Sequence, residues 1–188
     1  MLFHEVSILR LKESDTVKRK LAFIFLLFVV GAIGYLGFSI YDQLQEKQAV
    51  KERIAQLPEF STVDLDGRAI QNDGIIREAP LILTYFNTGC EYCRAEIRSI
   101  QNHKSLQERA MIYLISDEPA KVLKQFSSEF ELDSLQKIKV LQDSTAEVKE
   151  LFGVKGVPNT FVYNRDGKLL KSFEGETKAE ILYKLVKK

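Results

Sequence analysis

The chain contains two cysteines, Cys90 and Cys93, which are separated by two residues. Thiols at this spacing can close a small disulfide, so the pair can take up or release two electrons. An apolar stretch, residues 81–86, precedes the pair, and residues 91–109 follow it with helical spacing of their apolar side chains. The pattern predicts a strand that leads into a redox-active cysteine pair at the start of a helix.

The two sulfurs are expected to differ in reactivity. Only Cys90 lies where the first amides of the helix point, and their partial positive charge stabilises a thiolate, so we expect Cys90 to be the more acidic, attacking sulfur. Cys93, nearly one turn further on, should be more buried and should resolve a mixed disulfide by attacking Cys90. Glu96 lies on the same helix face as Cys93 and is a candidate proton acceptor or donor for its thiol. The alternative is an ordinary solvent-facing glutamate.

Two other interpretations of the pair are a zinc site and inert buried cysteines. A zinc site needs about four ligands, and beyond the pair the chain offers only His4 and His103 as histidines. We expect His103 to be a surface residue of the helix after the pair. We therefore expect no metal and no cofactor other than a redox-active Cys90–Cys93 disulfide.

Composition excludes some classes of partner. The formal net charge is +1, with 27 basic and 26 acidic residues spread along the chain. Such a balance gives no sign of a surface for polyanions, so nucleic acid is not an expected partner. With two cysteines in all, a separate structural disulfide is excluded as well.

A membrane segment is predicted near the start of the chain. Residues 21–40 contain no charged side chain, and about 20 such residues cross the hydrocarbon core of a bilayer as a helix. Basic residues 18–20 precede this segment, whereas Asp42 and Glu46 follow it. The positive-inside tendency therefore predicts a cytoplasmic tail, residues 1–20, before a single transmembrane helix, with the rest of the chain outside the cytoplasm.

Two alternatives to a retained anchor remain open: a cleaved signal peptide, whose apolar region usually has roughly 7 to 15 residues, and a buried soluble helix. An anchor and a signal peptide would both export the domain. Residues 41–57 are rich in charge and have apolar residues at near-helical spacing, which predicts a helical stalk that ends at Pro58.

Residues 58–188 show the pattern of one α/β domain. Asp66 and Gly67 separate two short apolar runs, which predicts an N-terminal β-hairpin. Strand and helix patterns then alternate, as in parallel crossover units. The expected strands are residues 81–86, 111–115, 139–142, 159–163 and 169–173, and the expected helices are residues 91–109, 120–130, 145–152 and 177–188, with Gly153 as a left-handed helix end.

The strand, the Cys-Glu-Tyr-Cys helix and the later run Gly-Val-Lys-Gly-Val-Pro-Asn-Thr-Phe, residues 153–161, occur in the order found in a known family. On these motifs the chain resembles the thioredoxin-fold, membrane-anchored TlpA/ResA-type thiol-disulfide oxidoreductases. The resemblance covers residues 58–188 and includes residues 116–119, the region of Asp143 and the turn at residues 164–167. It implies a thioredoxin-like fold, with a central mixed sheet flanked by helices.

The resemblance also implies the opposite wall of the site. In this family the proline at the position of Pro158 is cis and faces the cysteine pair, and the backbone before it, here Val157, binds an extended substrate segment. A cis bond before proline is uncommon enough to be a placed feature. The family also has a glutamate at the position of Glu96.

The chain departs from the family just before the pair. The tryptophan that often precedes the first cysteine is absent, and Thr88 and Gly89 lead into Cys90. Loss of the indole removes an apolar cover from the site. We expect Thr88, Gly89 and Tyr92 to contact substrate, with a specificity that differs from that of the relatives.

The function expected from the resemblance is an extracytoplasmic thiol-disulfide oxidoreductase that reduces disulfides of exported proteins. Apocytochrome c is one suggested client, a transmembrane thiol relay protein is the implied electron donor, and the bacterial cytoplasmic membrane is the expected location. A peroxiredoxin-like peroxidase is an alternative, although Asn87 stands where peroxiredoxins have Thr or Ser. A non-catalytic binding module is another.

Overall fold

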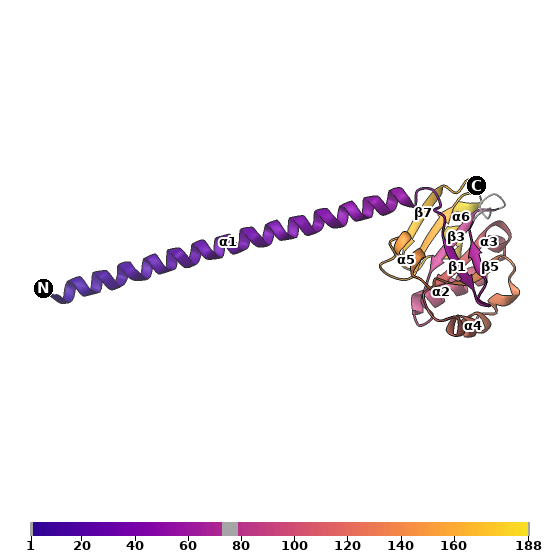
Figure 1. Ribbon diagram of the computed structural model, residues 1–188, viewed down its shortest axis with the longest axis horizontal. Helices are drawn as coiled ribbons and strands as arrows, with labels where there is room; N and C mark the ends of the chain where they lie inside the picture. The colour runs from indigo at the N-terminus through magenta and orange to yellow at the C-terminus, as the bar shows by residue number, and fades with distance from the viewer. Residues whose placement is uncertain (1, 73–78, 188) are drawn as a thin grey trace. The chain divides into compact units, whose positions relative to one another are not determined.

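The computed structural model describes residues 2–72 and 79–187 (Figure 1). The chain divides into two compact units, Met1–Gln48 and Ala49–Lys188. The first unit is formed by helix α1, Leu2–Arg53, whose last turn belongs to the second unit. The second unit contains the cysteine pair and all the strands described below.

Helix α1 confirms the predicted apolar helix. Its segment Phe23–Arg53 contains an 18-residue stretch with a mean hydropathy of 2.4 and is long and apolar enough to cross a membrane. None of the residues of that stretch is buried within the protein: Phe28 is 73% exposed and Phe38 is 71% exposed. Large apolar side chains on all sides of a helix are unfavourable in water and favourable in hydrocarbon, so the segment is a candidate membrane span.

The second unit is built on one seven-stranded sheet in the order β2-β1-β5-β4-β3-β6-β7. Strands β3, β4 and β5 are parallel, whereas β6 and β7 are antiparallel to their neighbours and the β1–β2 hairpin joins β5 in antiparallel fashion. The predicted central mixed sheet with an N-terminal hairpin is therefore confirmed. The strands are β1 Ser61–Asp64, β2 Ala69–Gln71, β3 Leu81–Tyr85, β4 Met111–Ser116, β5 Ile138–Gln142, β6 Asn159–Tyr163 and β7 Leu169–Glu174.

Helices cover both faces of this sheet, as predicted for an α/β domain (Figure 1). Side chains alternate along each strand, so Ile82 faces one apolar core while Leu81 and Leu83 face the other. The first core is closed by α2, α3, α4 and α6, and the second by α5 and residues 54–60. The helices are α2 Glu91–Gln101, α3 Lys104–Arg109, α4 Ala120–Glu129, α5 Glu147–Leu151 and α6 Ala179–Val186, with a 3₁₀ turn at Leu132–Ser134.

The helix after the cysteine pair is shorter than predicted. Residues 91–109 form two helices, because α2 ends at Gln101 and α3 begins at Lys104. His103 lies at the break, where its Nδ1 accepts a hydrogen bond of 3.1 Å from the backbone N–H of Leu106. The prediction of one continuous helix was therefore wrong, since a side-chain cap at His103 starts a new helix there.

The end of the predicted stalk forms part of the folded domain. Helix α1 stops at Arg53, and Ile54 and Leu57 are 4% and 9% exposed within the second core. The backbone of Gln56 pairs with Lys168 in an isolated bridge. The compact unit accordingly begins at Ala49, ahead of the domain start predicted at residue 58, because the apolar residues of the stalk bury themselves in it.

Gly153 ends α5 in the left-handed conformation that the sequence predicted, with φ of 62°. Its Cα also lies against Val50, because an added Cβ would be 2.9 Å from a methyl carbon of that residue. Gly67, in the hairpin turn, has φ of 87° and nothing within 4 Å of such a Cβ. The two glycines thus share the conformational requirement and differ in their packing.

We predict that Gly153→Ala destabilises the domain more than Gly67→Ala does. Both variants place a Cβ in the left-handed region, which costs about 1 to 2 kcal/mol, and only Gly153→Ala also overpacks the contact with Val50, by roughly 1 kcal/mol or more. Chemical denaturation of the two variants in detergent measures the difference. Equal losses in the free energy of unfolding would contradict the tight contact.

Candidate active site

The cysteine pair lies where strand β3 leads into helix α2. Cys90 is the residue that begins the helix, with extended backbone angles of −84° and 118°, and its Sγ accepts a hydrogen bond of 3.4 Å from the N–H of Cys93. Both cysteines are free thiols, Cys90 half-buried and Cys93 buried. The sequence prediction of a pair at a helix start, with the second cysteine inside, is therefore confirmed in its geometry.

Cys93 is placed on the buried face of α2 together with Glu96, Ile97 and Ile100. Its side chain is 0% exposed and belongs to the first apolar core. Burial raises the pKa of the Cys93 thiol well above its usual range, and a hydrogen bond to Cys90 and the nearby charge of Glu96 raise it further. Cys93 is thus a thiol at neutral pH, and it needs a proton acceptor before it can act as a nucleophile.

The loop before β6 forms the other wall of the site. The bond between Val157 and Pro158 is cis, as the resemblance implied. The thiol of Cys90 lies 3.8 Å from the carbonyl oxygen of Val157, to which it donates a weak hydrogen bond. Pro158 is buried, whereas Val157 is 36% exposed and Tyr92, between the cysteines, is 67% exposed. Apolar side chains thus lie exposed on both sides of Cys90.

Glu96 is buried, at 0% exposure, so the alternative of a solvent-facing glutamate is wrong. Its Oε1 accepts a hydrogen bond of 2.6 Å from Thr160 Oγ1, and its Oε2 accepts one of 3.0 Å from the N–H of Thr177. Burial raises the pKa of Glu96 to about 7, although the two hydrogen bonds oppose the shift. The carboxyl can therefore exchange a proton near neutral pH, within one helical turn of Cys93.

A second buried hydroxyl extends this network. Thr84 Oγ1 in β3 lies 2.8 Å from Thr160 Oγ1 in β6, and both residues are 0% exposed. Because Thr160 donates to the carboxylate, Thr84 is left to donate to Thr160. Neither threonine was predicted as a site residue, and the available signal was Thr84, whose small polar side chain stands among the large apolar and aromatic residues of 81–86.

The loop just before Cys90 is fixed by side chains from other elements. Glu118 accepts hydrogen bonds from both the N–H and the hydroxyl of Thr88, at 2.7 and 2.9 Å, and Arg94 Nη1 donates to the Thr88 carbonyl at 3.2 Å. Gly89 is exposed beside Cys90, and its N–H donates to Asn87 Oδ1. Gly89 and Tyr92 thus reach the exposed rim, while Thr88 is bound within the protein.

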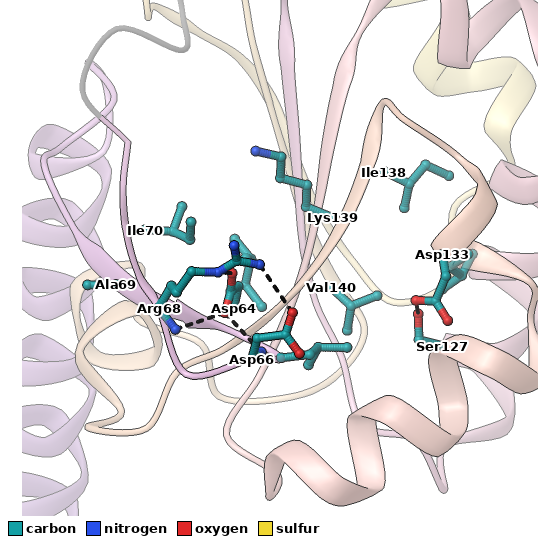
Figure 2. A pocket seen from close by; sticks show the side chains of 13 residues that line it. Asp64, Asp66, Arg68, Ala69, Ile70, Ser127, Asp133, Ile138, Lys139 and Val140 are labelled. Carbon is teal, nitrogen blue, oxygen red and sulfur yellow. Dashed lines mark hydrogen bonds and ion pairs between the residues drawn. The ribbon is translucent and has the colours of Figure 1, made fainter.

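A pocket of about 570 Å³ lies elsewhere, between the β1–β2 hairpin, the 3₁₀ turn and β5 (Figure 2). Arg68 in this pocket is bound by the carboxylates of Asp64 and Asp66, and Asp133 by the hydroxyl of Ser127. None of the residues predicted from the sequence to do chemistry lines it. The residues predicted to do chemistry therefore lie around Cys90, away from this pocket.

We predict that Glu96 makes stability depend on pH. Its pKa is raised from 4.5 to about 7 in the folded protein, so the folded state binds the proton more tightly, and this stabilisation is full below pH 4.5 and is lost as pH rises through about 7. Between about pH 4.5 and 8, the wild type should lose about 3 kcal/mol more than Glu96→Gln.

Chemical denaturation at the two pH values measures this difference. Glu108→Gln, which alters an exposed glutamate of α3, is the matched control and should follow the wild type. Parallel pH profiles for the wild type and Glu96→Gln would show that Glu96 does not hold a proton in the folded state.

Comparison with solved structures is consistent with this geometry. A secreted disulfide oxidoreductase of Mycobacterium tuberculosis aligns with a TM-score of 0.59 and 18% identity, over 72% of this chain and 97% of that one. The peroxidoxin BcpB of the same organism aligns with a TM-score of 0.61 and 20% identity, over 70% and 94%. These likenesses confirm the thioredoxin-like fold.

Sequence comparison places the chain in a family. The thiol-disulfide oxidoreductase ResA of Bacillus thuringiensis subsp. konkukian is 27% identical over 176 residues, which cover 91% of this chain and 97% of the relative. The model of the AhpC/TSA family matches residues 55–172, which include the cysteine pair, Glu96 and the cis-proline. The chain therefore belongs to the AhpC/TSA family.

Proposed function

We propose that this chain is a thiol-disulfide oxidoreductase, held at the membrane by α1, that reduces disulfides of exported proteins through Cys90 and Cys93. The observation that carries the proposal is the contrast between the two sulfurs, one half-exposed at the start of α2 and one fully buried on its inner face. The ResA relatives, which align along nearly the whole chain, support the same class of enzyme.

The first step is attack by the accessible sulfur. The thiolate of Cys90 attacks one sulfur of a substrate disulfide, so a bond forms between Cys90 and the substrate while the substrate disulfide breaks. The departing substrate sulfur leaves as a thiolate and takes a proton from water. The N–H of Cys93, which donates to Cys90 Sγ, helps to hold the attacking sulfur at the helix start.

The second step releases the substrate. Cys93 transfers its proton to Glu96 and attacks Cys90 Sγ, so a Cys90–Cys93 disulfide forms and the second substrate sulfur leaves as a thiolate. Two electrons have then passed from the pair to the substrate. Glu96 suits the role because its raised pKa, about 7, lets it accept a proton and lose it again near neutral pH.

We assign substrate binding to the residues around Cys90. The Val157 carbonyl contacts Cys90 Sγ, the buried Pro158 follows it, and Gly89 and Tyr92 are exposed residues close to Cys90 in the chain. An extended, partly apolar segment around the substrate disulfide fits such a surface. Thr88 contributes indirectly, since its polar groups are bound to Glu118 and Arg94.

The orientation of the membrane segment determines the compartment of the domain, and so the proteins it can react with. Basic residues 18–20 before the apolar segment favour a cytoplasmic N-terminus, so the domain would lie outside the cytoplasmic membrane. A reductase in that compartment needs electrons from the membrane, and a transmembrane thiol relay protein is the donor we propose. Apocytochrome c is a candidate client on the basis of the resemblance to ResA-type proteins.

Trapping tests the proposed roles of the two sulfurs. Cys93→Ser should accumulate mixed disulfides through Cys90 with exported proteins, because attack can occur and resolution cannot. Non-reducing electrophoresis of membranes, followed by identification of the trapped proteins, measures this. Cys90→Ser is the matched control and should trap none; equal trapping by both variants, or none by either, would refute the proposed roles.

A peroxidase is the second candidate, favoured by the AhpC/TSA match and by the peroxidoxin among the structural neighbours. Asn87 opposes it, since its side chain accepts from Gly89 at the position where peroxiredoxins have Thr or Ser. We predict that the reduced protein consumes hydrogen peroxide slowly, and that Cys93→Ser does not sustain the reaction. Rapid consumption that survives Cys93→Ser would reverse the order of the two candidates.

A further inference from the structure

The position of Cys90 depends on a loop without regular structure. Residues 86–89 join the end of β3 to the start of α2, and they decide where the sulfur lies relative to the carbonyl of Val157 and the N–H of Cys93. Disulfide exchange needs the attacking sulfur in line with the bond that breaks, and small errors in such placement slow a reaction strongly. What fixes this loop therefore bears on the reaction.

Within the loop, Thr88 is fixed at each of its polar groups. Its N–H donates to Glu118 Oε2 at 2.7 Å and its hydroxyl to Glu118 Oε1 at 2.9 Å, so one carboxylate binds one residue with both oxygens. Its carbonyl accepts from Arg94 Nη1 at 3.2 Å. Hydrogen bonds to a charged group are shorter and stronger than neutral ones.

Glu118 is itself held in place. Its N–H donates to Ser116 Oγ at 3.2 Å, and the same hydroxyl lies 3.3 Å from Glu118 Oε2. Ser116 is the fully buried last residue of β4, and Pro119, directly after Glu118, is the residue that precedes α4. The carboxylate is thus fixed to the central sheet before any substrate arrives.

Arg94, which binds the Thr88 carbonyl, is also held in place. Its guanidinium forms an ion pair with Glu129 at the end of α4 and lies over the rings of Phe126 and Phe130, 5.5 and 4.9 Å from their centres. Glu118 precedes α4 and Glu129 ends it, so both ends of one helix are connected to Thr88. The two ends of α4 therefore hold the loop of residues 86–89 through Thr88.

We propose that Glu118 is a positioning residue, which acts through Thr88 to hold Cys90 in line with a substrate disulfide bound along Val157 and Pro158. The inference rests on the proposed function and goes beyond it. A bulky peptide disulfide fixes the direction of attack, whereas a small exposed disulfide can approach Cys90 from many directions. Loss of the Glu118 contacts should therefore slow exchange with the peptide selectively.

The test compares two disulfides in the full-length protein in detergent: a cystine-bridged peptide and the small reagent 5,5′-dithiobis(2-nitrobenzoate). Both react with Cys90, so a change in its ionisation cancels in the ratio of the two rates. Glu118→Gln should lower the ratio of the peptide rate to the reagent rate about tenfold. Glu108→Gln, an exposed glutamate of α3 that lies outside the site, is the control and should keep the wild-type ratio.

Two variants of Thr88 test the same contacts independently, in case Glu118→Gln does not fold. Thr88→Val removes one of the two donors and should lower the ratio roughly threefold, whereas Thr88→Ser keeps both donors and should restore most of it. Thermal unfolding identifies any variant that fails to fold. If Glu118→Gln is such a variant, the ratio of rates measured for Thr88→Val tests the inference.

An unchanged ratio in Glu118→Gln or Thr88→Val would overturn the inference, as would a loss in Thr88→Ser equal to that in Thr88→Val. If the wild type reduces the peptide and the ratio does not respond, this inference alone fails. If the wild type reduces neither disulfide, the proposed function fails with it.

Discussion

The site depends on the first turn of helix α2, which places one cysteine at the surface and the other in the apolar core. The chain enters the helix at Cys90, with the sulfur at the surface, and three residues later Cys93 lies at 0% exposure in the apolar core. A thiol so placed resists ionisation, because a buried charge is costly without a partner. The buried carboxyl of Glu96, one turn further along the same face, is the group that can receive its proton.

The mixed sheet brings the remaining parts to that turn of helix. Strand β6 runs antiparallel to β3, and this pairing places Thr160 beside Thr84 and brings the cis bond at Pro158 to the level of Cys90. The hydrogen bond from Thr160 then fixes the carboxyl of Glu96 from the strand side. The reactive turn follows β3 and the cis-proline precedes β6, and these two strands pair directly in the sheet.

Local signals in the sequence predicted much of this arrangement. The helix start at the cysteine pair, the turn at Asp66–Gly67 and the helix end at Gly153 are set by a few neighbouring residues, and each was predicted and is observed. The contacts of Glu96 with Thr160 and of Thr88 with Glu118 were not predicted, because they join residues 64 and 30 positions apart and depend on strand register. The break at His103 was missed because its cap competes with a helical pattern that looks continuous.

The central claim is that the two sulfurs have separate tasks set by their exposure, and competitive alkylation tests it most directly. Reduced full-length protein is treated with limiting iodoacetamide at about pH 7, and mass spectrometry measures the modification of each cysteine. Carboxamidomethylation of Cys90 should be at least about 100-fold faster than that of Cys93, whose thiol is buried and protonated. Equal rates, or faster modification of Cys93, would contradict the account.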